Sequence, residues 1–149
     1  MEIEIANSYD QLKDPELKIH QIITSIQNSR YTIADGILSI VICDEDTICR
    51  IHAQFLGDPS PTDVITFPGK FNDNFTGEIF ISADQAKKNA HEFKTSFDHE
   101  MTLYLVHGCL HLHGLNDKTD SEKNVMRKGE EELLTKIKKE VQAPPFSLC

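Results

Sequence analysis

Residues 98–117, DHEMTLYLVHGCLHLHGLND, constrain the fold of this chain more than any other stretch. Apolar residues recur on nearly every side of a helix built from it, and a helix that is apolar all round is normally buried. His107 and His111 are four residues apart, so their imidazoles lie on one face of such a helix, one turn apart. The stretch therefore predicts a buried helix that directs a pair of histidines into a pocket.

A third ligand is needed before such a pair can hold a metal ion firmly. Gly114 follows the histidines and suits a left-handed helix end. The chain can then double back and bring Asn116 and Asp117 toward the two imidazoles. We predict a metal site made of His107, His111 and Asp117, with a fourth coordination position left open.

Each part of this prediction has a simpler alternative. A histidine pair at this spacing often arises by chance on a helix, without any metal. Asp117 would then be a solvated aspartate in the turn before Thr119. His113 lies about 120° around the helix from the pair, so we expect it to pack or to face solvent rather than to bind metal.

Length and charge limit the classes of protein to consider. The 149 residues suit one domain, which we place at residues 1–142, and the net charge of −9 argues against a broadly basic nucleic-acid-binding surface. No apolar run is long enough to cross a bilayer and the first residues lack a signal pattern, so no membrane association is expected. The four cysteines show no C-x-x-C spacing, which favours reduced thiols in a cytoplasmic protein.

Alternation and helical periodicity predict an α+β domain with about four strands in a mixed sheet, four or five helices, and the histidine helix buried among them. The expected strands cover residues 2–6, 37–43, 62–67 and 78–82. The expected helices cover residues 15–28, 47–56, 83–94, the histidine stretch, and 119–141. Residues 70–77 should form a loop, and residues 143–149, APPFSLC, a loose C-terminal tail.

Two separated stretches resemble a known family. HGCLHLHGLND resembles the H-G-x-L-H-L-x-G-Y-D-H signature of the YbeY-type endoribonucleases, which are rRNA maturation factors. PTDVITFPG, followed by GEIFIS, resembles that family's P-T-D-V-L-S-F-P and G-D-I-x-I-S segments, and the resemblance runs from about Ile48 to Leu134. It implies a four-stranded sheet with helices, one zinc ion per chain on three histidines, and hydrolysis of single-stranded RNA. It also implies ribosomal RNA and the small ribosomal subunit as partners.

This sequence departs from the family pattern at positions that bear on the chemistry, and one of them is Asn116, where aspartate is usual. Asp117 stands where the family has its third histidine, and carboxylate oxygen is an accepted zinc ligand. Leu56 stands where the family has an arginine, and His52 where it has an asparagine. Phosphodiester attack normally needs a cation to meet the growing negative charge, so the missing arginine predicts slow catalysis.

We therefore predict metal-assisted phosphodiester hydrolysis in rRNA maturation and ribosome biogenesis, with Zn²⁺ as the cofactor. Glu78 is a candidate for a supporting position beside the ligands. The residue at 108 is glycine, so the base of an H-E-x-x-H metallopeptidase is missing, and the general base stays unassigned, with His113 and His99 as candidate proton shuttles. Two alternatives stay open: a zinc hydrolase or peptidase of another substrate, and a non-catalytic ribosome-assembly factor whose metal is structural.

Overall fold

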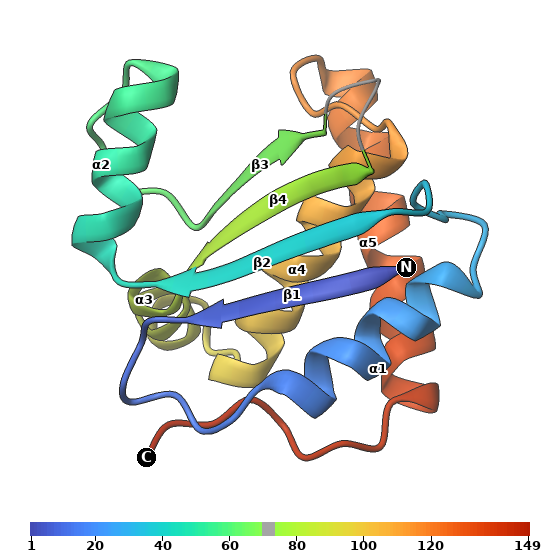
Figure 1. The fold of residues 1–149 in the computed structure, drawn as a ribbon, viewed down its shortest axis with the longest axis horizontal. Coiled ribbons are helices and arrows are strands. Elements are labelled where there is room, and N and C mark those ends of the chain that lie inside the picture. Colours follow the sequence, from blue (N-terminus) through green and yellow to red (C-terminus); the bar gives the residue numbers. More distant parts are fainter. Residues whose placement is uncertain (70–73) are drawn as a thin grey trace.

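The computed structural model describes residues 1–69 and 74–149, and in that part the chain forms four strands and five helices (Figure 1). In chain order the elements are β1 (Glu2–Asn7), α1 (Glu16–Gln27), β2 (Ile37–Cys43), α2 (Glu45–Leu56), β3 (Val64–Pro68), β4 (Phe75–Ser82), α3 (Ala83–Phe93), α4 (Phe97–His113) and α5 (Asp120–Glu140).

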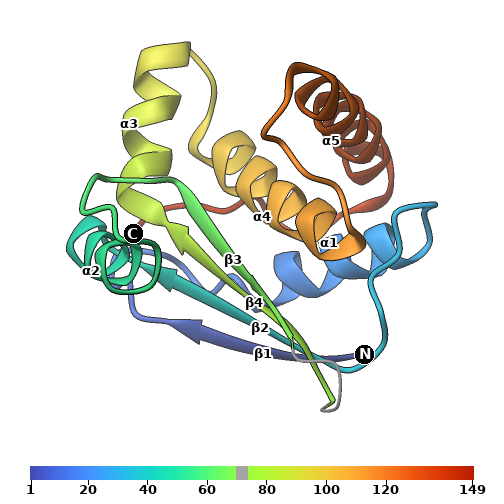
Figure 2. The ribbon, with the colours of Figure 1, turned by 90° about the horizontal axis from the view of Figure 1, so that it is seen from above.

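The four strands form one mixed sheet in the order β1-β2-β4-β3. β1 pairs with β2 and β2 with β4 in parallel, whereas β3 runs antiparallel to β4 along the edge of the sheet. This arrangement confirms the predicted α+β class and the four-stranded mixed sheet. Figure 2 shows that α1, α4 and α5 all lie on one face of the sheet.

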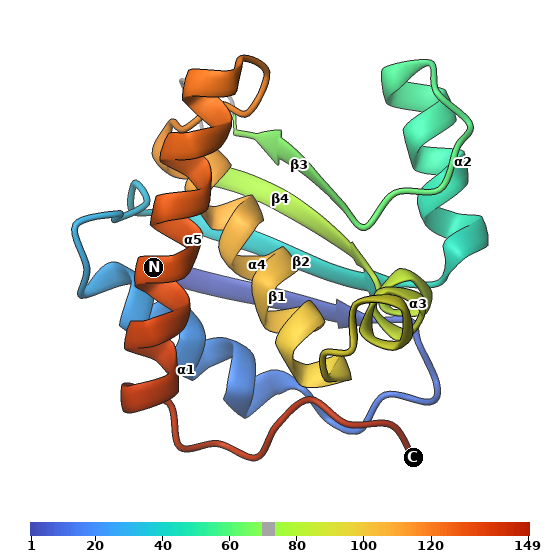
Figure 3. The ribbon, with the colours of Figure 1, turned by 180° about the vertical axis from the view of Figure 1, so that it is seen from behind.

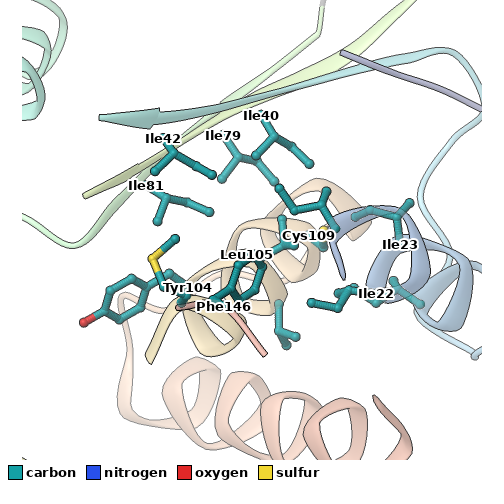
Figure 4. Close-up of a cluster of buried hydrophobic side chains, with 14 of the residues drawn as sticks. Ile22, Ile23, Ile40, Ile42, Ile79, Ile81, Tyr104, Leu105, Cys109 and Phe146 are labelled. Carbon is teal, nitrogen blue, oxygen red and sulfur yellow. The ribbon is translucent and has the colours of Figure 1, made fainter. Parts of the chain in front are cut away.

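The main core lies between that face of the sheet and the helices α1 and α4. β-branched residues alternate along β2 and β4, so one set of side chains points at the helices and is fully buried. Figure 4 shows these isoleucines beside Leu105 and Cys109 of α4 and Ile23 of α1. The predicted burial of the histidine helix is confirmed, because α4 contacts β3, β4, α3 and α5.

Gly108 allows α4 to approach the sheet closely. A Cβ atom added at this position would lie 2.9 Å from Ile79 Cγ2 and 3.1 Å from Thr66 Oγ1. Because no larger residue fits there without displacing a buried side chain, the helix backbone lies directly over β4 and the edge strand β3. The neighbouring residue, His107, is thereby held next to the edge of the sheet.

The predicted strands and helices are present. Their ends differ by a few residues from the predicted ends, because backbone hydrogen bonding determines where each element begins and stops. The strand expected at 62–67 covers Val64–Pro68, and the one expected at 78–82 starts at Phe75. The loop predicted over 70–77 lies partly outside the described residues, at 70–73, and its last residues belong to β4. In the described part of the chain, every helix is too short or too polar to span a bilayer.

The prediction of a loose tail at residues 143–149 is wrong. Phe146 is only 5% exposed and packs in the main core, where an aromatic side chain gains a large apolar burial. Its backbone N–H donates to Asp98 Oδ1 at 2.7 Å, and Leu148 forms an isolated β-bridge with Leu12. Apolar burial and backbone hydrogen bonds therefore fix the tail against α4 and the segment before α1.

Candidate metal centre

The end of α4 and the turn that follows it bring three ligand-type side chains together. His107 and His111 lie one turn apart on α4, and Gly114 ends the helix with a φ of +121°. The chain then returns, so that Asp117 Oδ2 lies 3.3 Å from His107 Nε2 and 3.5 Å from His111 Nε2. The two Nε2 atoms are 3.0 Å apart. These three residues, the metal-binding triad predicted from the sequence, form a group that could hold a metal ion.

The other nitrogen of each imidazole has its own hydrogen-bond partner. His107 Nδ1 donates to Glu130 Oε2 at 2.8 Å, and His111 Nδ1 donates to the carbonyl oxygen of Leu115 at 3.0 Å. Because a carboxylate and a carbonyl only accept hydrogen bonds, each Nδ1 carries the proton and each neutral ring keeps its lone pair at Nε2. Partners of this kind fix the tautomer and the orientation of metal-binding histidines in many proteins.

The spacing of the three ligand atoms fits a tetrahedral ion. Ligand atoms about 2.0–2.1 Å from zinc, at tetrahedral angles, lie about 3.3–3.4 Å from one another. The three distances of 3.0, 3.3 and 3.5 Å bracket this value. Two Nε2 lone pairs and a carboxylate oxygen facing one another repel unless a proton or a cation lies among them. The donor set and its geometry therefore suit a divalent ion with nitrogen and oxygen ligands.

Electrostatics favours positive charge at this position. Burial alone disfavours a charged imidazole at His107, but the hydrogen bond and charge of Glu130, with Asp117 and Asp63 nearby, outweigh it and raise the pKa of His107. The carboxylates that attract a proton to His107 attract a metal ion by the same Coulomb interaction. A proton and a metal ion therefore compete for the same nitrogen.

The metal-binding triad lines an open cleft of about 440 Å³. In Figure 3, α2 and the turn between α4 and α5 stand on opposite sides of β3, and the lining residues come from these regions and from the last turns of α4. His52 and Leu56 belong to α2, and residues 62–66 with Pro68 belong to β3 and the segment before it. The triad, Leu112 and Asn116 complete the lining. A cleft bounded by an edge strand and two helical segments can admit an extended chain.

Among the described residues that line the cleft, two side chains besides the triad can ionise, Asp63 and His52. Burial raises the pKa of the Asp63 carboxyl group. His52 Nδ1 donates to the carbonyl oxygen of Ser60 at 2.9 Å, which orients the ring. Leu56 lines the same cleft and is 57% exposed, so its position presents an apolar side chain where the family pattern has a cation.

The structure separates three other candidate residues from the triad. Glu78 does not support the triad. Side chains alternate along β4, and because Ile79 faces α4, Glu78 points to the opposite face of the sheet. There Glu78 accepts a hydrogen bond from Ser39 Oγ at 2.9 Å. His113 packs edge-on against the ring of Tyr31 and donates from Nδ1 to a carbonyl oxygen outside the cleft. His99 lies in the first turn of α4, at the other end of the helix.

Sequence reasoning missed two residues of the site, Glu130 and Asp63. Glu130 is the hydrogen-bond partner of His107, although it lies on α5, 23 residues away along the chain. The spacing Met126-x-x-x-Glu130 agrees with the family pattern after the histidine motif, which is a sequence signal, but nothing local links Glu130 to His107. Asp63 lies inside the PTDVITFPG stretch, which pointed to the family without assigning the residue a place in the cleft.

Comparison with known proteins supplies an independent line of observation. The family model described as endoribonuclease YbeY matches residues 2–138. The chain is 37% identical to the endoribonuclease YbeY of Christiangramia forsetii over 97 residues, which are 65% of this chain and 68% of that protein. It is 32% identical to the endoribonuclease YbeY of Bacteroides thetaiotaomicron over 125 residues, covering 83% and 91% of the two chains. A Thermotoga maritima protein solved in solution superposes with a TM-score of 0.61 at 26% identity, covering 96% of this chain and 97% of that one.

Proposed function

Because this chain belongs to the endoribonuclease YbeY family and is thus a hydrolytic endoribonuclease, we propose that it cleaves single-stranded RNA with the help of a bound divalent ion. We propose further that the ion is zinc, one per chain, and that the reaction serves the maturation of ribosomal RNA on the small ribosomal subunit, in the cytoplasm.

The observation that carries this proposal is the geometry of the metal-binding triad. Three acceptor atoms converge within 3.0–3.5 Å of one another, and all three residues line one open cleft. Glu130 and the carbonyl of Leu115 hold both imidazoles with their lone pairs toward Asp117. A bound zinc ion would lower the pKa of a water ligand and polarise a phosphate oxygen.

The remaining chemistry falls to the chain's own groups in the cleft. Among the described lining residues, Asp63 is the carboxylate outside the triad, and burial raises its pKa, which makes it a stronger base than an ordinary aspartate and a candidate to accept and return a proton. His52 stands on the opposite wall, with its Nδ1–H on the Ser60 carbonyl, and only the protonated imidazole has an Nε2–H that can donate a hydrogen bond to a phosphate oxygen. The apolar Leu56 contributes no charge to either step.

Metal content and RNA cleavage, measured on the same preparations, test the proposal. Protein purified without chelator should carry one ion per chain by elemental analysis and cleave a single-stranded RNA oligonucleotide more readily than its duplex. His111→Ala should lose most of the metal and the cleavage. His113→Ala is the matched control, because it removes a histidine from the same helix outside the cleft. Equal metal content in the two variants would contradict the assignment of the triad.

Leu56→Arg tests whether the missing cation limits the rate. A guanidinium at this lining position should meet charge that develops on the phosphate and raise cleavage, with unchanged metal content. A variant no faster than wild type would show that this position does not limit the chemistry.

The exposed Leu56 also favours one alternative, a non-catalytic ribosome-assembly factor whose metal is structural. Binding to the small ribosomal subunit without cleavage, by metal-loaded wild-type protein, would support this alternative. A peptidase is disfavoured, because position 108 is a glycine packed against Ile79 rather than a glutamate in the cleft.

A further inference from the structure

A second groove, of about 470 Å³, lies at the opposite end of α4 from the metal-binding triad. Its walls come from three helices: Lys18 of α1, the first turns of α4, and the last turns of α5. Figure 3 shows the C-terminal end of α5 descending beside α1. The lining of this groove shares no residue with the cleft that contains the metal-binding triad.

Lys18 is a largely buried cation whose hydrogen-bonding capacity is unused. Its side chain is 12% exposed, and its ammonium lies 3.5 Å from Asp98 Oδ1. That oxygen also accepts the backbone N–H of Phe146 at 2.7 Å, so it is shared between two partners. Within the described chain Lys18 Nζ makes no hydrogen bond, although an ammonium has three donors. Because Lys18 also lines the open groove, its remaining donors are available to an acceptor that enters it.

Two more donors belong to the same groove. Thr102 is buried, and among the described residues its Oγ1 has no hydrogen-bond partner. Lys138 lines the groove from α5, is exposed, and pairs with no acidic residue in the described ranges. The first turn of α4, which adjoins the groove, carries the positive end of the helix dipole. The groove lining contains two lysines and one aspartate, Asp98, so positive charge exceeds negative charge there, although the net charge of the chain is −9.

The remaining part of the lining is apolar and comes from one side of α5: Leu134, Ile137 and Val141. A volume of 470 Å³ lies in the range of sites for small molecules, which combine an apolar surface with a few polar anchors. We propose that this groove binds a small organic anion. Lys18 and Lys138 hold its phosphate or carboxylate group, and its apolar body lies on the α5 side chains.

The test follows backbone amide signals of the full-length ¹⁵N-labelled protein by NMR during titration with three probes of similar size. Phenyl phosphate and benzoate each carry an anionic group on a ring, and benzyl alcohol is the uncharged control. The titrations use His111→Ala protein, so that a phosphate bound at a metal ion cannot produce the signals. We expect saturable shifts at Thr102, Asp98 and residues 134–141 with at least one anion and none with benzyl alcohol.

Lys138→Gln should weaken the binding of that anion about tenfold, because one charge-assisted contact is lost. Lys139→Gln is the matched control, since Lys139 is the next residue on α5, equally exposed and outside the groove lining. Saturation by phenyl phosphate alone identifies a phosphate ligand, and saturation by benzoate alone identifies a carboxylate ligand. Either result, with the difference between the two lysine variants, supports the site. Absence of saturable shifts, equal binding of benzyl alcohol, or equal weakening by both substitutions overturns it.

Discussion

Replacing Glu130 with glutamine isolates the contribution of the residue that orients His107. Glu130 Oε2 accepts a 2.8 Å hydrogen bond from His107 Nδ1, and its side chain is 20% exposed, so solvent screens the pair only partly. Glutamine has nearly the same shape and keeps a carbonyl oxygen that can accept this hydrogen bond. The substitution therefore removes the negative charge while leaving an acceptor for the imidazole.

Removing the negative charge of Glu130 should lower the metal affinity of the site. Partners of metal-binding histidines change metal affinity by about 10- to 100-fold when they are removed. Because glutamine retains the hydrogen bond, we expect the lower end, about tenfold, which corresponds to roughly 1.4 kcal/mol of binding free energy. A second effect acts in the opposite direction. Glu130 raises the pKa of His107, so the substitution should lower that pKa and reduce competition from protons.

The assay must therefore separate the two effects by pH. Zinc affinity is measured by competition with a chromophoric chelator at pH 8 and at pH 6, and histidine pKa values by NMR on the metal-free protein. The affinity difference between wild type and Glu130→Gln should be larger at pH 8, where fewer protons compete. Glu131→Gln is the matched control, because its side chain is exposed and makes no hydrogen bond or ion pair within the described residues. Equal affinities of the two variants at pH 8 would refute the reasoning.

Four further predictions concern the site and the packing around it. Asp117→Asn should weaken metal binding, whereas Asp117→His should preserve it, as titration of both variants with zinc will show; unchanged binding in both would exclude Asp117 as a ligand. Gly108→Ala should lower the free energy of unfolding by about 1–3 kcal/mol through overpacking, and a melting temperature equal to wild type would contradict the close approach of α4 to the sheet. Phe146→Ala should cost about 3–5 kcal/mol in a urea titration, because a buried ring is lost, whereas a loose tail predicts almost no change. With a thiol reagent at pH 8, Cys149 should react quickly because it is exposed, and Cys109 only on unfolding, because burial raises its pKa to about 12; equal rates would contradict the buried packing of α4.

The sequence by itself determined the features that depend on neighbours along the chain. β-branched residues at 37–43 predict a strand, and β2 covers the same residues. His107 and His111 are four residues apart and the α-helical repeat is 3.6 residues, so they share one face of the helix wherever that helix packs in the fold. Thr119 and Glu122 form a capping box at the start of α5, since both partners belong to one turn. Asp117 is brought close to the histidines because the turn after α4 is too short to carry it away.

Tertiary structure alone decided every contact between residues that are distant in sequence. Glu130 reaches His107 because α5 packs along α4, and Lys18 of α1 meets Asp98 in the first turn of α4 only in the folded chain. Phe146 looked like part of a loose tail, yet it fills a space in the core that only the assembled helices create. Such partners are selected by shape and by the burial of apolar surface shared among several elements. No periodicity in the chain encodes them, because each depends on how whole helices pack once their apolar faces are buried together.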